Sequence, residues 1–442
     1  MRIIFIYPSM GNRESYRVKM RGGKIKSWSP EPLTIATLNG LTPAHYERIF
    51  FDDRLEPIDY DINADLVAIT AETFTVKRAY QIASEFRKRG KQVIMGGFHA
   101  SILPEEAIDY CDSILIGEAE GIWDKILADA EQGKLAKIYR STQSDLSTVR
   151  VDRSIYGNKK YFPVTMVESG RGCKFHCDFC SVTLFFQGRH RRRPIAQVIE
   201  EIKKANNKLV LFVDDNICAD FSSAKELFRA LIPLKIKWMS SASVDIVHDG
   251  GLLDLIKKSG CQALLVGFES INSDNLSAMH KNQNLVPGIV DRLIKELYKR
   301  KIKIYATFVM GYDYEDNQSA QATFDYAMKN KFLLSNFYQL TPLPGTNLYK
   351  KLEKENRLIY KKWWLDDAYS YGEVVFQPKN MKRFELSAVC QKMRLNFYSF
   401  KNIMKRSLNF GFRNYFFYLV FNLLTRKEII HKQGRILGRN KS

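Results

Sequence analysis

Three of the seven cysteines lie within eight residues, in the stretch SGRGCKFHCDFCSV that runs from 169 to 182. Cys173, Cys177 and Cys180 are separated by three and by two residues. Three thiolates on one loop can bind three irons of a four-iron cluster and leave the fourth iron open to a substrate or cofactor. The spacing therefore predicts a catalytic iron–sulfur centre with these three cysteines as metal ligands.

Two other interpretations of the cysteine group remain open. A structural zinc site usually has four protein ligands, and His176 is the only nearby candidate for the fourth. A chance group of core cysteines would have apolar neighbours, whereas Lys174 and Asp178 are polar. The other four cysteines, Cys111, Cys218, Cys261 and Cys390, are isolated, which is typical of small buried side chains in a reducing compartment.

Residues 1–140 predict an α/β domain of the doubly wound, Rossmann-like type. Apolar runs at 2–8, 64–70, 91–97 and 112–117 are typical of buried parallel strands, and 75–90 has helical periodicity. Ligands of such sheets bind beyond the carboxyl ends of the strands. The candidate cofactor-binding residues at those ends are Thr70, Gly96, Gly97, His99, Gly117 and Glu118.

A polar linker is expected at 141–161, followed by a second α/β domain at 162–350. Its six strand-like runs are 163–169, 208–215, 236–243, 261–270, 302–311 and 335–346. Alternation with helical segments predicts a partial (β/α)6 barrel, whose active-site residues should follow the strands. The cysteines directly follow the first run. Residues 351–442 are expected to form a basic, mostly helical C-terminal region.

The cysteine spacing, with aromatic Phe179 before the last cysteine, resembles the signature of the radical S-adenosylmethionine (SAM) enzymes. The resemblance implies a [4Fe–4S] cluster whose open iron binds SAM, which one electron cleaves to a 5′-deoxyadenosyl radical. It further implies contacts to the methionine end of SAM, to its ribose and to its adenine. Those contacts would come from Asp214, Asp215 and Asn216, from Glu269 and Ser270, and from Gly311, respectively. Helix capping is the alternative role for Asp214, Asp215 and Asn216, and a turn is the alternative for Gly311.

Residues 1 to about 380 resemble the subgroup that carries an N-terminal cobalamin-binding-type domain and includes the hopanoid methylases. The resemblance lies in 31–43, 64–70, 96–107 and 117–123, and it implies a cobalamin-dependent methyltransferase. The stretch 50–59 lacks the histidine and glycine of the Asp-x-His-x-x-Gly cobalamin motif. His99 is therefore either a border of the corrin or a structural hydrogen-bonding residue. A non-methylating oxidative cyclase or rearranging enzyme is one alternative, and a non-catalytic cofactor-binding or regulatory protein is another.

The formal net charge is +20, and residues 382–441 contain 14 Lys and Arg against two acids. With the aromatic run 414–424, this predicts either a helical segment packed on the body or one lying on an anionic membrane. A hydrophobic or lipid-like substrate is expected, and no nucleic-acid partner. The resemblance implies a flavodoxin- or ferredoxin-type electron donor, and the run GRHRRRP at 188–194 is interpreted as a solvated turn or its docking site. Without a signal-peptide pattern, a cytoplasmic location is expected, with peripheral membrane contact as a variant.

Overall fold

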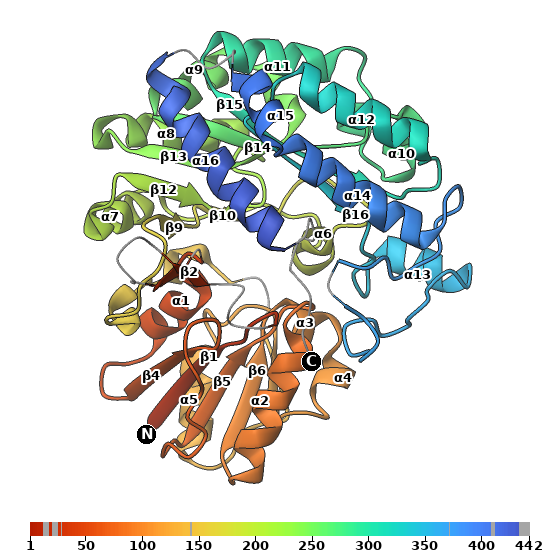
Figure 1. The fold of residues 1–442 in the computed structure, drawn as a ribbon. Coiled ribbons are helices and arrows are strands. Elements are labelled where there is room, and N and C mark those ends of the chain that lie inside the picture. The colour runs from red at the N-terminus through yellow and green to blue at the C-terminus, as the bar shows by residue number, and fades with distance from the viewer. Residues whose placement is uncertain are drawn as a thin grey trace. The chain divides into compact units, whose positions relative to one another are not determined.

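The computed structural model describes residues 1–11, 17–19, 25–27, 29–141, 144–370, 372–407 and 412–432. The chain divides into two compact units, and Figure 1 shows the elements of each. The first comprises Met1–Gly170, Leu184–Gln187 and Arg191–Asn207, and the second comprises Arg171–Thr183, Gly188–His190 and Lys208–Ser442.

The first unit contains a six-stranded parallel sheet with the order β4-β1-β5-β6-β7-β8. Its strands are β1 (Arg2–Tyr7), β4 (Glu47–Asp52), β5 (Leu66–Thr70), β6 (Gln92–Gly96), β7 (Ser113–Ile116) and β8 (Ile138–Arg140). The order reverses at β1, as in doubly wound folds, and confirms the predicted fold class. Ile3 to Ile6 are all fully buried, because a central parallel strand is covered on both faces.

Two strands of this sheet, β4 and β8, are absent from the sequence expectation. β4 begins with the charged pair Glu47 and Arg48, and only part of the strand is buried. β8 has three residues, of which only Tyr139 is buried. Both are edge strands, so they lack the continuous apolar run that marks the central strands.

Helices and short strands complete the first unit. The helices are α1 (Leu33–Leu41), α2 (Val76–Lys88), α3 (Phe98–Ile102), α4 (Pro104–Ala107), α5 (Trp123–Glu131) and α7 (Ile195–Ala205). The short strands are β2 (Arg17–Lys19), β3 (Ile25–Ser27), β9 (Thr165–Val167) and β11 (Arg191–Arg192). β10 (Gly170–Arg171) and α6 (Ser181–Phe186) cross the division between the units.

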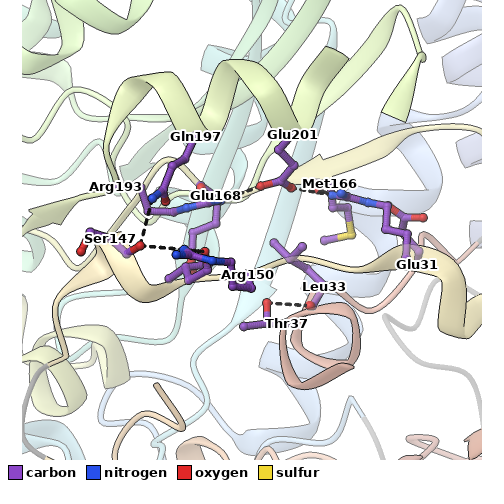
Figure 2. A network of polar contacts seen from close by, with 12 residues as sticks. Glu31, Leu33, Thr37, Ser147, Arg150, Met166, Glu168, Arg193, Gln197 and Glu201 are labelled. Atoms are coloured by element: carbon purple, nitrogen blue, oxygen red, sulfur yellow. Dashed lines mark hydrogen bonds and ion pairs between the residues drawn. The ribbon is translucent and has the colours of Figure 1, made fainter. Parts of the chain in front are cut away.

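Two arginines of the basic run 188–194, the buried Arg193 and the half-buried Arg191, form ion pairs within the first unit. Glu201 of α7 accepts from Arg193 and from Arg153, each at 2.7 Å, and Arg153 also binds Glu31 at 2.6 Å. Figure 2 shows Arg193 beside Glu201. Arg191 binds both oxygens of Glu118, at 2.6 and 2.9 Å. The solvated-turn interpretation is therefore wrong for Arg193, which is buried against Glu201, and Arg191 is paired with Glu118 while its side chain stays partly exposed.

The second unit contains five neighbouring parallel strands in the order β16-β15-β14-β13-β12. They are β12 (Leu209–Phe212), β13 (Lys237–Ala242), β14 (Cys261–Glu269), β15 (Lys303–Met310) and β16 (Leu334–Gln339). The connecting helices are α8 (Phe221–Leu231), α9 (Gly250–Lys258), α10 (Ser273–Ala278), α11 (Ile289–Lys299), α12 (Asn317–Lys329) and α13 (Asn347–Lys354). Phe268, Phe308 and Phe337, one from each of three adjacent strands, stack in the core.

Three C-terminal helices, α14 (Arg383–Phe397), α15 (Phe400–Ser407) and α16 (Phe412–His431), belong to the second unit. The fully buried Arg406 donates to the carbonyl oxygens of Phe332 and Phe397 at 2.8 and 2.9 Å. It also donates to Asn422 Oδ1 at 3.0 Å. The described part of this region is thus packed on the barrel body, whereas residues 408–411 and 433–442 lie outside the described residues.

Candidate functional site

The three-cysteine loop leads from β10 to α6, and all three thiols are half-buried. The backbone N–H of Cys180 donates to the carbonyl of Cys177 at 3.2 Å, which makes a tight turn between these ligands. Burial raises the pKa of Cys177 to about 11, and the nearby Cys180 and Cys173 thiolates also raise it. Burial likewise raises the pKa of Cys180. The sulfurs are therefore close enough to influence one another.

The donor set fits an iron–sulfur cluster with one open iron. Thiols with a raised pKa keep their protons at neutral pH, and a cationic iron centre displaces those protons when it binds. Among the described residues, no three His, Cys, Asp or Glu side chains are arranged to hold a single metal ion. In a four-iron cluster each cysteine ligates a different iron, so the three sulfurs need not meet around one ion.

The end of β12 supports the first cysteine. Asp215 Oδ2 accepts a hydrogen bond of 2.8 Å from the backbone N–H of Gly172, next to Cys173. Asn216 Nδ2 lies 3.8 Å from the Cys173 sulfur and donates to Ser243 Oγ at 3.0 Å. The structure therefore brings the predicted residues Asp215 and Asn216 to the cysteine loop. Asp214, the third predicted residue, is buried directly before them.

Glu269, predicted to reach the ribose, forms an ion pair at the end of β14. Its Oε1 lies 2.8 Å from Lys281 Nζ, and the two side chains are 10% and 12% exposed. The positive charge of Lys281 opposes the effect of burial by lowering the pKa of Cys177. Lys281 is a candidate functional residue that sequence reasoning missed. No sequence pattern marked it, because its contact with Glu269 spans a loop and a helix.

A strained backbone places this ion pair. Glu269 has φ +64°, a conformation that favours glycine, and the pairing of β14 with β15 shifts register between Gly267 and Glu269. A Cβ on Gly267 would lie 2.2 Å from Glu269 Oε1 and 2.9 Å from Lys281 Nζ. Asn284 Nδ2 donates to the carbonyls of Gly267 and Phe268 at 3.1 and 3.0 Å. Glycine at 267 is therefore needed for the ion pair to lie against the strand.

Ser270 and Gly311 have local structural roles in addition to their predicted ones. Ser270 Oγ accepts from the backbone N–H of Asn272 at 3.1 Å, in the turn before α10. Gly311 has φ +111°, and a Cβ there would lie 2.5 Å from Leu386 Cδ2 on α14. Ser270 thus supports the turn before α10, and glycine at 311 allows α14 to pack against the end of β15.

In the first unit, the predicted residues line the carboxyl edge of three neighbouring strands, β5, β6 and β7. A Cβ on Gly97 would lie 2.7 Å from the Ala71 carbonyl and 3.1 Å from Thr70 Oγ1. One on Gly117 would lie 2.6 Å from the Ser141 carbonyl. Gly96 closes the same edge, because its carbonyl accepts from the Ala71 N–H at 2.8 Å. Thr70 and the glycines thus form a closely packed edge made largely of backbone.

His99 and Glu118 are both engaged inside the first unit. His99 is fully buried, its Nδ1 lies 3.2 Å from Thr73 Oγ1, and its Nε2 lies 3.1 Å from Glu106 Oε1. Both ring nitrogens are therefore occupied, as expected for a structural histidine. Glu118 accepts from Arg191 and from the Ser144 N–H at 2.9 Å.

The parallel sheets and the three-cysteine loop beside the carboxyl ends of barrel strands define an iron–sulfur enzyme of the β/α-barrel class. Residues 167–327 match the Radical SAM superfamily. The bacteriochlorophyllide d C-12(1)-methyltransferase of Chlorobaculum tepidum is 30% identical over 389 residues, covering 85% of this chain and 84% of the relative. The chain belongs to the radical SAM superfamily, and this membership confirms the resemblance inferred from the cysteine motif.

Two further comparisons support the assignment. The bacteriochlorophyllide d C-8(2)-methyltransferase of the same organism is 27% identical over 400 residues, covering 85% of this chain and 87% of the relative. The radical SAM methyltransferase TsrM of Kitasatospora setae, solved with cobalamin and a [4Fe–4S] cluster, has a TM-score of 0.63 at 15% identity. The match covers 80% of this chain and 75% of TsrM, and it shows a common fold.

Proposed function

We propose that this protein is a cobalamin-dependent radical SAM methyltransferase that methylates an unactivated carbon of a hydrophobic substrate. The observation that carries the proposal is the match to two methyltransferases along 85% of the chain. A match over 85% of the chain must extend into both units, which supports a shared two-domain arrangement. The domain limits predicted from the sequence belong to the same proposal.

Cys173, Cys177 and Cys180 would hold the [4Fe–4S] cluster, which supplies the electron for SAM cleavage when it is bound. Asp215 fixes the backbone before the first cysteine, and Asn216 places an amide N–H near that sulfur. Lys281 places a positive charge beside Cys177. Ser270 and Gly311 stay in the proposal as SAM contacts, together with Asp214 and Glu269.

The edge formed by Thr70, Gly96, Gly97, Gly117 and Glu118 would hold cobalamin. Three of these five residues are glycines, and the glycines at 97 and 117 let the backbone of neighbouring segments pack closely at the edge that would face the cofactor. TsrM, which shares the fold, was solved with cobalamin bound. Both nitrogens of His99 are occupied by Thr73 and Glu106, so we propose that His99 supports the edge and is not a cobalt ligand.

Exposed apolar and basic residues of the C-terminal helices support peripheral contact with an anionic membrane. On α15, Phe400 is 60% exposed and Met404 is 37% exposed, and Lys401 and Lys405 beside them are exposed. On α16, Leu423 and Ile430 are exposed near Lys427. Within the described residues, no helix is long and apolar enough to cross a bilayer. Such contact would give a cytoplasmic enzyme access to a lipid-like substrate.

An electron donor of the flavodoxin or ferredoxin type is part of the proposal. Arg191 and Arg193 are committed to Glu118 and Glu201, so the run 188–194 offers less free charge for docking than its sequence suggests. We place the donor at the barrel, on the side of the cysteine loop, because electron transfer to the cluster requires proximity.

The test begins with anaerobic purification, reconstitution with iron and sulfide, incubation with hydroxocobalamin, and gel filtration. We expect near-stoichiometric cobalt and about four irons per chain, with the iron lost in the variant in which Cys173, Cys177 and Cys180 are all changed to Ala. Methyl-labelled SAM should then transfer its label to bacteriochlorophyllide d or to a lipid extract. Iron without cobalt, with a cyclised or rearranged product, would replace the proposal by the non-methylating alternative.

A further inference from the structure

Asp178, inside the cysteine loop, is held by three separate elements of the second unit. Its backbone N–H donates to the carbonyl of Met279, at the end of α10, at 3.2 Å. Its own carbonyl accepts from the N–H of Leu348, in α13, at 3.1 Å. Its side-chain Oδ1 accepts from the hydroxyl of Tyr312, just after β15, at 2.5 Å. Asp178 therefore fixes the loop to the barrel between two of the predicted ligands, Cys177 and Cys180.

The contact between Asp178 and Tyr312 is buried and specific. Asp178 is 7% exposed and Tyr312 is 2% exposed. The ring of Phe179, the next residue of the loop, meets the Tyr312 ring edge-on at a centroid distance of 6.5 Å. Tyr312 thus contacts two successive residues of the loop, one through its hydroxyl and one through its ring. A hydrogen bond to a carboxylate is stronger than one between neutral groups.

We propose that the hydrogen bond from Tyr312 to Asp178 is a clasp that positions the cysteine loop and sets how firmly the iron–sulfur cluster is held. Both residues act through the cysteines and are positioning residues. The inference rests on the proposed cluster site at Cys173, Cys177 and Cys180, and it requires neither cobalamin nor methyl transfer. The cysteine spacing supplies the ligands, while the clasp keeps Cys177 and Cys180 in the geometry that binds iron.

The experiment uses the anaerobically reconstituted full-length protein and measures iron release to excess EDTA from the loss of cluster absorbance. Tyr312→Phe removes the hydroxyl but keeps the ring against Phe179. We expect release about tenfold faster than in the wild type, which is the effect of losing a buried hydrogen bond to a carboxylate. The reduced cluster should also show a broadened or shifted electron paramagnetic resonance spectrum. Tyr314→Phe, two residues away at a ring 52% exposed, is the matched control and should match the wild type.

Two variants of Asp178 test the partner. Asp178→Asn keeps an oxygen that accepts from Tyr312 and should release iron at a rate closer to wild type than Asp178→Ala does. The double variant Tyr312→Phe/Asp178→Ala should be no faster than Asp178→Ala alone, because both changes remove the same bond. The proposal is wrong if the effects of the two single variants on the rate of iron release multiply in the double variant. It is also wrong if Tyr312→Phe releases iron at the wild-type rate.

A variant that only destabilises the fold is distinguished from one that alters the cluster site by a separate measurement of thermal stability. The thermal midpoint of each variant is measured before cluster incorporation. If Tyr312→Phe lowers this midpoint and leaves the spectrum of the reduced cluster unchanged, the bond serves the barrel and the clasp is rejected. Should Tyr312→Phe not fold, Asp178→Asn and Asp178→Ala give the same comparison. If the wild-type protein holds about four irons but transfers no methyl group, the proposed function is wrong. The test of the hydrogen bond between Tyr312 and Asp178 still applies in that case, because it measures only how the cluster is held.

Discussion

Asp215 Oδ2 accepts a hydrogen bond of 2.8 Å from the backbone N–H of Gly172, which joins the end of β12 to the residue before the first cysteine. Gly172 has φ +87°, a conformation that few other residues adopt. The carboxylate of Asp215 therefore stabilises a turn that only glycine forms easily, and this turn directs Cys173 toward the site.

Asp215→Ala should weaken the attachment of the cysteine loop. Loss of a hydrogen bond to a carboxylate costs on the order of 1.5 kcal/mol, so we expect a lower iron content after gel filtration. The measurement is iron per chain after identical reconstitution. Asp215→Asn is the control, because its amide oxygen still accepts from Gly172. Equal iron loss in both variants would mean that the charge of Asp215 matters and the hydrogen bond does not.

Lys281→Met should destabilise the fold by leaving the Glu269 carboxylate buried without its cation. Removing one partner of a buried ion pair costs about 3 kcal/mol, measured as the free energy of unfolding by denaturant before cluster incorporation. The double variant Lys281→Met/Glu269→Gln should recover part of this loss, since no unpaired charge remains. If the two single losses simply add in the double variant, the two charges do not stabilise one another.

The raised pKa of Glu315 should make the stability of the fold depend on pH. Burial raises the pKa of this carboxyl to about 7, although Ser319 Oγ donates to it at 2.6 Å and lowers the pKa. The folded state therefore binds a proton that the unfolded state releases near pH 4.5. Stability should fall as the pH rises from about 4.5 to 7, by about 3 kcal/mol, and then level off for this group.

The measurement for Glu315 is the free energy of unfolding across that pH range. Glu315→Gln, which resembles the protonated carboxyl, should lose the part of the slope that this group contributes. Glu296→Gln, at a partly exposed ion pair with Arg300, is the control for a general effect of removing a carboxylate. A slope retained in full by Glu315→Gln would show that folding does not raise the pKa of Glu315.

Arg406→Met should lower the free energy of unfolding by about 3 kcal/mol. The change leaves the buried carbonyls of Phe332 and Phe397 without this donor, and each lost partner costs about 1–3 kcal/mol. Lys405→Met, at the exposed neighbouring position, should stay within about 0.5 kcal/mol of the wild type. Denaturant unfolding of the three proteins measures the difference. Similar stability of both variants would show that the C-terminal helices contribute little to the barrel.

The sequence alone determined the local features of this protein. Cysteine spacing within one loop predicted the family, because three ligands of one centre can be supplied by eight consecutive residues. Apolar runs predicted the central strands of both units, because a parallel strand covered on both faces needs a continuous apolar sequence. The edge strands β4 and β8 were missed, since half-exposed strands carry no such run. The roles of the individual site residues remain predictions.

Only the tertiary structure decided the contacts between residues that are distant in the sequence. It paired Lys281 with Glu269, joined Tyr312 to Asp178, and gave both ring nitrogens of His99 a hydrogen-bond partner. It also showed that Arg191 and Arg193, which the sequence suggested were surface charges, form ion pairs with Glu118 and Glu201. A charged residue has the same appearance in a sequence whether it faces water or a buried carboxylate. The folded chain makes that distinction, because a charge can be buried only where packing brings an opposite charge or enough hydrogen-bond partners to it.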